Sequence, residues 1–110
     1  MNNDKIVLVT GANKGLGKEI AGQLAAAGYT VVVAARSLSA GQAVADVLVA
    51  KGYSAHAVKL EVTDAADIQQ VVSWLENKFG RLDVLVNNAG IALEWNEGGT
   101  TAEQIGRAHV

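Results

Sequence analysis

The sequence contains no cysteine and no long apolar run, and each absence excludes a class of protein. Without cysteine there is no disulfide framework, no thiolate metal site and no cysteine nucleophile, and the composition fits a cytoplasmic location. The longest apolar stretch, Val31–Ala35, is far shorter than the roughly 20 residues that a membrane-spanning helix needs. Near the amino terminus, residues 6–9 are too few to form the apolar core of a signal peptide.

The chain also carries little net charge. A formal charge of −2 argues against a partner that is a nucleic acid or a membrane surface, because both are polyanions. Half of the 110 residues are hydrophobic and 18% are charged, which is enough for the core of one small domain. His56 and His109 have no partner at metal-ligand spacing, so no metal site is predicted.

Short apolar runs alternate with helical patterns from one end of the chain to the other. Strands are expected at 6–9, 30–35, 55–62 and 82–86. Helices are expected between them, ending at Gly28, Gly52 and Gly80. The β-α-β-α-β-α-β order predicts an α/β domain, the N-terminal part of a doubly wound parallel sheet. Right-handed crossovers leave few topologies, and the Rossmann order is among them.

Polar residues precede the expected helices, and apolar residues recur along them at helical spacing. Ser37 or Ser39 is expected to cap the second helix, and Asp64 the third, with Asp67 in its first turn. The expected apolar faces are Leu16, Ile20 and Leu24; Val44, Val47 and Leu48; and Ile68, Val71, Val72, Leu75 and Phe79. Trp74 lies near the last of these faces and is expected to pack there.

A glycine-rich turn, Thr10–Gly17, joins the first strand to the first helix. Glycine permits a tight turn, a close approach of backbone to a pyrophosphate and close packing of helix on strand. The N–H groups at the helix start then favour an anion. The spacing Gly-x-x-x-Gly-x-Gly differs from the commoner dinucleotide fingerprint and is not a P-loop. An ordinary flexible turn is the alternative reading.

Two motifs together resemble one family. Thr10–Gly17 is similar to the Thr-Gly-x-x-x-Gly-x-Gly motif of short-chain dehydrogenases/reductases, and Asn87-Asn88-Ala89-Gly90 resembles that family's second signature. The resemblance covers the chain from about Lys5 to Leu93. The residues of the two motifs are similar to those of the carbonyl-reductase branch of the family. It implies an oxidoreductase that interconverts carbonyl compounds and alcohols, small-molecule substrates, by hydride transfer. The complete protein would be a monomer or a homo-oligomer.

The residue after the second strand indicates which nicotinamide cofactor is bound. NAD sites usually have an acidic residue there, whereas this chain has Arg36, whose planar guanidinium suits a 2′-phosphate. Lys14 in the glycine turn adds a second positive charge. Both residues predict NADP(H), unless they are merely solvated surface cations. Ala40 replaces a basic residue that is frequent in the carbonyl-reductase branch, which leaves the strength of the preference open.

The resemblance implies further contacts with the cofactor. Glu61 stands where the family has an aspartate that accepts a hydrogen bond from adenine, and Val62 assists through its backbone; a solvated strand-end carboxylate is the alternative. Thr10 and Asn87 are expected to brace the sheet. The predicted cofactor-binding residues are Gly11, Asn13, Lys14, Gly15, Leu16, Gly17, Arg36, Glu61, Val62, Asn88, Ala89 and Gly90.

The catalytic residues that the family uses are missing from the sequence. The family's tyrosine has a lysine four residues later, but Val33 follows Tyr29 and Ala57 follows Tyr53 at that spacing. The Ser-Tyr-Lys group is therefore expected beyond the chain end, and the chain alone is expected to be inactive. A non-catalytic, redox-sensing NADP(H)-binding regulator is the alternative function.

The last six residues resemble a translated sequencing adapter. Ile105–Val110 corresponds to the codons ATC GGA AGA GCA CAC GTC, so we expect residues 1–104 to be the cofactor-binding part of one Rossmann domain and residues 105–110 to be an artefactual tail. A further strand would then be missing beside the fourth. The exposed hydrophobic edge predicts a poorly soluble or molten chain.

Overall fold

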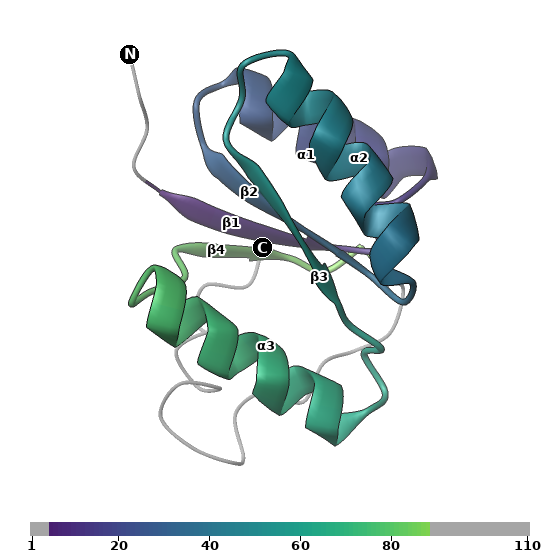
Figure 1. Ribbon diagram of the computed structural model, residues 1–110, viewed down its shortest axis with the longest axis vertical. Helices are drawn as coiled ribbons and strands as arrows, with labels where there is room; N and C mark the ends of the chain where they lie inside the picture. Colours follow the sequence, from purple (N-terminus) through teal and green to yellow (C-terminus); the bar gives the residue numbers. More distant parts are fainter. Residues whose placement is uncertain (1–4, 89–110) are drawn as a thin grey trace.

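The computed structural model describes residues 5–88, which form a parallel sheet with helices on both faces (Figure 1). The strands are β1 (Ile6–Thr10), β2 (Thr30–Ala35), β3 (Ala55–Lys59) and β4 (Val84–Val86). The helices are α1 (Gly15–Ala26), α2 (Leu38–Ala50) and α3 (Ala65–Lys78). The strand order is β3-β2-β1-β4, and every pairing is parallel, which confirms the predicted α/β class.

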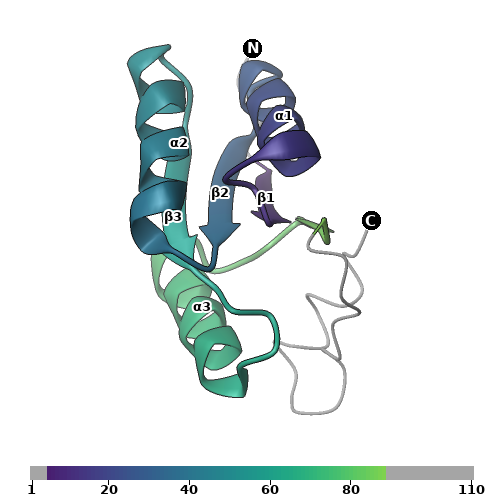
Figure 2. The ribbon, with the colours of Figure 1, turned by 90° about the vertical axis from the view of Figure 1, so that its right-hand side faces the viewer.

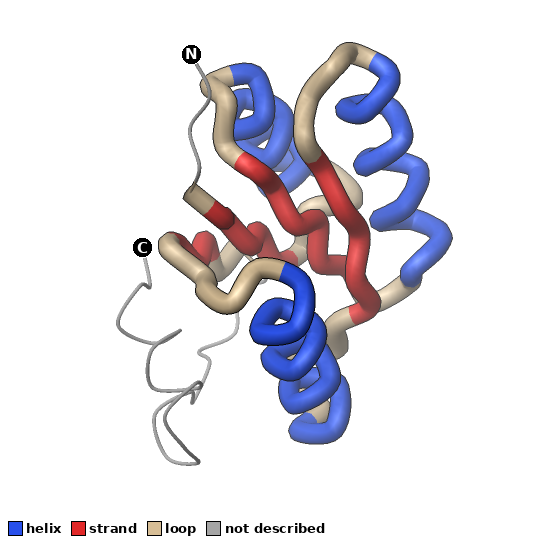
Figure 3. Tube along the Cα trace, turned by 60° about the vertical axis from the view of Figure 1, so that its left-hand side comes forward, coloured by secondary structure: helices blue, strands red, loops and turns tan. Residues whose placement is uncertain are grey.

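The sheet separates two layers of helices. Helices α1 and α2 cover one face and α3 covers the other (Figures 2 and 3). Alternate residues of a strand point to opposite faces, so Val31 and Val33 join the core under α1 and α2, while Val32 packs on the side of α3. Both faces of β1 and β2 are buried, which explains their continuous apolar sequences.

The third and fourth strands are shorter than predicted. β3 ends at Lys59 rather than residue 62, and β4 begins at Val84 rather than at residue 82. Leu60 is buried, and its N–H donates to the Ala35 carbonyl at 2.8 Å, but the chain then leaves the sheet. Apolar residues beyond a strand end can thus fill the core without pairing in the sheet.

The ends of the helices follow local signals in the sequence. Gly28, Gly52 and Gly80 have φ values of 101°, 90° and 74°, and each lies just after the residue that closes its helix. This left-handed conformation is easily adopted only by glycine. Of the two serines that could cap α2, Ser37 does so, because its side chain accepts a hydrogen bond from the Ala40 N–H.

The buried faces of α1 and α2 differ from the prediction. Leu16 is 68% exposed and Val47 is 53% exposed, whereas both were expected to face the core. The fully buried residues of α1 are small: Gly17, Ala21 and Ala25. The predicted Ile20 and Leu24 are partly buried and pack against the same core, so Leu16 alone of the predicted α1 face is exposed. On α3, the predicted Val71, Val72 and Leu75 are buried.

Three rings pack together between β3 and α3. His56 on β3 lies edge-on to Trp74 and Phe79, with ring centroids 5.9 Å and 5.5 Å apart, and Trp74 lies 5.6 Å from Phe79. The packing role predicted for Trp74 is therefore confirmed. Partial burial and the nearby Lys78 ammonium both lower the pKa of His56 from 6.5. Along residues 5–88, no helix combines the length and apolarity needed to cross a bilayer.

Candidate functional site

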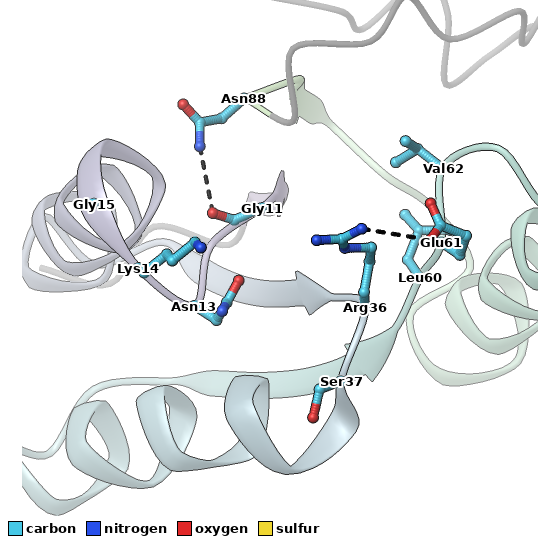
Figure 4. A pocket seen from close by; sticks show the side chains of 10 residues that line it. All are labelled: Gly11, Asn13, Lys14, Gly15, Arg36, Ser37, Leu60, Glu61, Val62 and Asn88. Atoms are coloured by element: carbon cyan, nitrogen blue, oxygen red, sulfur yellow. Dashed lines mark hydrogen bonds and ion pairs between the residues drawn. The ribbon is translucent and has the colours of Figure 1, made fainter.

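A cavity of about 640 Å³ lies where the carboxyl ends of the strands meet, as expected for the ligand crevice of a parallel α/β sheet (Figure 4). Its lining residues follow four different strands: Gly11, Asn13, Lys14, Gly15, Arg36, Ser37, Leu60, Glu61, Val62 and Asn88. Most of the predicted cofactor-binding residues are among them, and Ser37 and Leu60 were not predicted. Ser37 could have been found, because it follows Arg36 directly at the strand end.

Two glycines shape the loop between β1 and α1. Gly11 and Gly15 have φ values of 62° and 59°, in the left-handed region. The loop is tied to the neighbouring strand, because the Ala12 N–H donates to the Ala34 carbonyl at 3.2 Å. Helix α1 then begins at Gly15. The first hydrogen bond of the helix runs from the Lys18 N–H to the Lys14 carbonyl, so the N–H groups before Lys18 are not used by this helical bonding. Such N–H groups at a helix start are available to an anion.

Gly17 and Leu16 lie behind this loop rather than in the cavity wall. Gly17 is buried against the Gly11 backbone and the side-chain amide of Asn88, with no room for a Cβ atom. Asn88 donates from Nδ2 to the Gly11 carbonyl oxygen at 3.3 Å. Gly17 therefore shapes the cavity indirectly, by letting α1 lie close to the loop. The Leu16 side chain is exposed, so only its backbone is in a position to contribute to an anion site.

The end of β4 is tied to the end of β1 by hydrogen bonds of the Thr10 hydroxyl. The Thr10 hydroxyl accepts from the Asn88 N–H at 2.9 Å and lies 3.2 Å from Asn87 Oδ1. It also lies 3.4 Å from the Val86 carbonyl oxygen. These contacts agree with the bracing role predicted for Thr10 and Asn87, and they position Asn88 at the cavity. Ala89, Gly90 and residues 105–110 lie outside the described residues.

Charged side chains of both signs face the cavity. Lys14 is the residue that precedes α1, and Arg36 follows the end of β2, so the two cations line the cavity from different elements. Opposite them, Glu61 Oε1 lies 4.0 Å from Arg36 Nη1 (Figure 4). The cavity thus presents a positively charged wall with one carboxylate at its edge.

Asp67 has a role that its place in the first turn of α3 did not reveal. Its Oδ2 accepts from Lys59 Nζ at 2.7 Å and from the Glu61 N–H at 2.9 Å. The hydrogen bonds from Lys59 and from the Glu61 backbone lower the pKa of Asp67, and the bond to Asp67 raises the pKa of Lys59. Asp67 therefore joins β3, α3 and the loop that carries Glu61. The contact depends on tertiary packing, so spacing alone could not have found it.

The comparison with known families agrees with the two motifs and their position in the fold. Residues 5–107 match the sequence model of the short chain dehydrogenase family. The chain belongs to this family. The match continues into the segment 105–110 that was predicted to be artefactual.

Individual short chain dehydrogenases resemble the chain over most of its length. It is 43% identical over 103 residues to the 3-oxoacyl-[acyl-carrier-protein] reductase FabG of Escherichia coli strain K12. The alignment covers 84% of this chain and 41% of FabG. The structure of menthone neomenthol reductase from Mentha piperita matches with a TM-score of 0.76 and 39% identity, covering 81% of the chain and 32% of that protein.

A third match is to YwfH, described as an NADPH-dependent reductase involved in bacilysin biosynthesis. Its structure gives a TM-score of 0.72 at 31% identity and covers 76% of this chain and 36% of YwfH. The chain thus spans less than half the length of the short chain dehydrogenases that it matches.

Proposed function

We propose that the chain is the cofactor-binding part of an NADP(H)-dependent oxidoreductase that interconverts carbonyl compounds and alcohols. The observation that carries this proposal is the cavity beside the glycine loop, which Lys14 and Arg36 both line. The relatives' names point the same way, since FabG and the Mentha piperita enzyme are reductases and YwfH is described as NADPH-dependent.

The residues at the cavity fit a dinucleotide phosphate. The left-handed Gly11 and Gly15 and the start of α1 leave backbone N–H groups for the pyrophosphate. Arg36 and Lys14 would supply two cations for a 2′-phosphate, and Glu61 and the Val62 backbone, which line the same cavity, would hold adenine. Asn88 borders the cavity on the side of β4, where Ala89 and Gly90 follow it in the sequence.

The bound nicotinamide would supply the hydride for reduction of a carbonyl carbon, or accept it from an alcohol. Proton transfer to the oxygen requires a separate acid, and neither Tyr29 nor Tyr53 has a lysine four residues later. We therefore propose that residues 5–88 bind and orient the cofactor, while proton transfer depends on residues outside them. On this proposal the 110-residue chain binds NADP(H) without turning over substrate.

Replacing Arg36 with aspartate tests the proposed cofactor. A charge-assisted bond contributes about 1.5–3 kcal/mol, so the wild-type chain should bind NADPH about tenfold to hundredfold more tightly than NADH. In Arg36→Asp this preference should vanish or reverse, because a carboxylate repels the 2′-phosphate and accepts hydrogen bonds from ribose hydroxyls. Isothermal titration calorimetry with both cofactors measures the ratio.

Lys51→Asp is the matched control, since it makes the same change of charge at the end of α2 and does not line this cavity. Its ratio of NADPH to NADH affinity should stay within about twofold of the wild-type value. Equal affinities for the two cofactors in the wild-type chain, or an Arg36→Asp ratio like that of the control, would rule out the proposed role of Arg36.

A further inference from the structure

Contacts of the side chain and of the backbone place Glu61 at the edge of the cavity. Its Oε2 accepts from the Thr63 hydroxyl at 3.2 Å, and its Oε1 lies 4.0 Å from Arg36 Nη1. Its backbone N–H donates to Asp67, which is itself paired with Lys59 at 2.7 Å. Glu61 is therefore a negative charge with a defined position at the edge of the cavity, beside the cation expected to meet the 2′-phosphate.

The two members of the Arg36–Glu61 pair differ in their freedom to move. The Arg36 side chain is 80% exposed and lines the cavity, whereas that of Glu61 is 34% exposed and accepts a hydrogen bond from the Thr63 hydroxyl (Figure 4). A ligand that attracts the more exposed guanidinium would draw Arg36 away from the carboxylate. The backbone bond to Asp67 and the bond from Thr63 favour a Glu61 carboxylate that remains near the anion bound by Arg36.

We propose that Glu61 is a specificity-determining residue that limits the preference of this site for 2′-phosphorylated cofactors. This inference rests on the proposed function, because it assumes that the adenosine end of the cofactor occupies this cavity. A 2′-phosphate must compete with Glu61 for Arg36 and is also repelled by the carboxylate. A ligand with a free 2′-hydroxyl leaves the Arg36–Glu61 pair intact, so the positive charge of Arg36 stays compensated.

The length of the side chain matters for this role. Glutamate extends one methylene further than aspartate, and its Oε1 lies 4.0 Å from Arg36 Nη1. Shortening the side chain should draw the charge away from Arg36 while keeping it near adenine. Neutralising it should remove both the competition and the repulsion, and glutamine keeps an oxygen that can accept a hydrogen bond from adenine.

Two small ligands isolate the effect on the adenosine end. Adenosine 2′,5′-bisphosphate and 5′-AMP differ only in the 2′-phosphate, and calorimetry on the 110-residue chain gives the ratio of their dissociation constants. Glu61→Gln should raise the preference for the bisphosphate about threefold to tenfold. Both ligands carry adenine, so a change in adenine binding alters both affinities and cancels in the ratio. Glu61→Asp should give an intermediate ratio.

Two further variants separate this effect from general changes of charge or folding. Glu76→Gln removes the same charge on α3, does not line the cavity and should leave the ratio unchanged. Thr63→Val removes the hydroxyl that holds Glu61 Oε2, and should raise the preference in the same direction but less. Thr63→Val also provides the test if Glu61→Gln does not fold, as judged by circular dichroism.

The outcomes distinguish this inference from the proposed function. A Glu61→Gln ratio equal to or below the wild-type ratio overturns the role of Glu61, even if the wild-type chain prefers the bisphosphate. A wild-type chain without that preference contradicts the proposed cofactor. If the wild-type chain lacks the preference, a preference of Glu61→Gln for the bisphosphate still supports the role of Glu61. If Glu61→Gln also lacks it, both the role of Glu61 and the proposed cofactor are overturned.

Discussion

The side-chain amide of Asn88 occupies the space in which a Cβ atom on Gly17 would lie. The Gly11 carbonyl oxygen lies against the same position and accepts from Asn88 Nδ2 at 3.3 Å. Two segments at opposite ends of the described chain, the glycine turn and the end of β4, are thus fitted together around one missing side chain. Both of them line the cavity, so their fit determines its shape.

Gly17→Ala should therefore weaken both folding and cofactor binding. The added methyl group meets backbone of Gly11, which cannot move without disturbing the loop, so we expect a loss of about 1–3 kcal/mol in the free energy of unfolding. NADPH affinity should fall with it. Urea denaturation and calorimetry measure the two effects.

Gly22→Ala in the same helix is the matched control. A Cβ atom at Gly22 meets no atom within 4 Å, and alanine is a better helix former than glycine. We expect Gly22→Ala to be neutral or to stabilise the chain by about 0.5–1 kcal/mol, with NADPH affinity unchanged. Equal effects of the two substitutions would mean that the Gly17–Asn88 contact does not constrain the site.

Replacing Asp67 with asparagine should destabilise the chain in a pH-dependent way. Hydrogen bonds from Lys59 and from the Glu61 backbone hold the pKa of Asp67 below its usual value. The stability that Asp67 contributes is then fully present above its unfolded-state pKa, near 4, and is lost as the pH falls through the lower folded-state pKa. Asparagine keeps an oxygen for the Glu61 N–H but loses the charge that pairs with Lys59.

Melting temperatures from pH 2.5 to 7 measure this dependence. Asp67→Asn should melt below wild type at pH 7, and the two curves should converge toward the acid end. Asp46→Asn is the control, since the Asp46 carboxylate lies on the exposed side of α2 and accepts a hydrogen bond from the neutral Gln42 amide rather than from a lysine. A constant difference between Asp67→Asn and wild type at every pH would contradict the electrostatic explanation.

His56 should make the chain less stable in mild acid. Burial and the Lys78 charge lower its pKa below 6.5 in the folded state, so the unfolded chain takes up the proton more readily. The associated stability is present above about pH 6.5 and is lost as the pH falls through the folded-state pKa. His56→Phe keeps a ring against Trp74 and Phe79 and should flatten this pH dependence.

Urea midpoints between pH 5 and 7.5, together with an NMR titration of His56, check this expectation. Lys78→Gln should raise the measured pKa of His56 part of the way toward 6.5, because it removes one of the two causes of the shift. A wild-type pKa above 6.5 would show that the ring is not desolvated in the cluster.

The parts of the fold that the sequence predicted are those set by local chemistry. The glycines after each helix and the Asp64 and Ser37 caps act within one turn of chain, so their residue types identify them. The predicted face of α1 was right for Ile20 and Leu24, which pack against the core, and wrong for Leu16. It also missed Gly17, Ala21 and Ala25, because small residues carry little hydrophobic signal.

For the candidate site, the residues near one another in sequence were predicted, and the contacts between separate elements were not. Residues in the two motifs and at strand ends line the cavity as expected, because parallel strands bring their carboxyl ends to one edge. Asp67 was taken only as a helix-start carboxylate, since its bond to the Glu61 N–H depends on how α3 packs beside β3. Contacts between elements need the assembled fold.

The cavity is built from loops that each belong to a different strand. On the proposed function, the loop after β1 would bind the pyrophosphate, the residue after β2 the ribose substituent, and the turn after β3 adenine. These tasks would then be separable along the gene. Exchanging one or two codons, at 36 and 61, would change the preferred cofactor while the glycine turn and the core stay untouched.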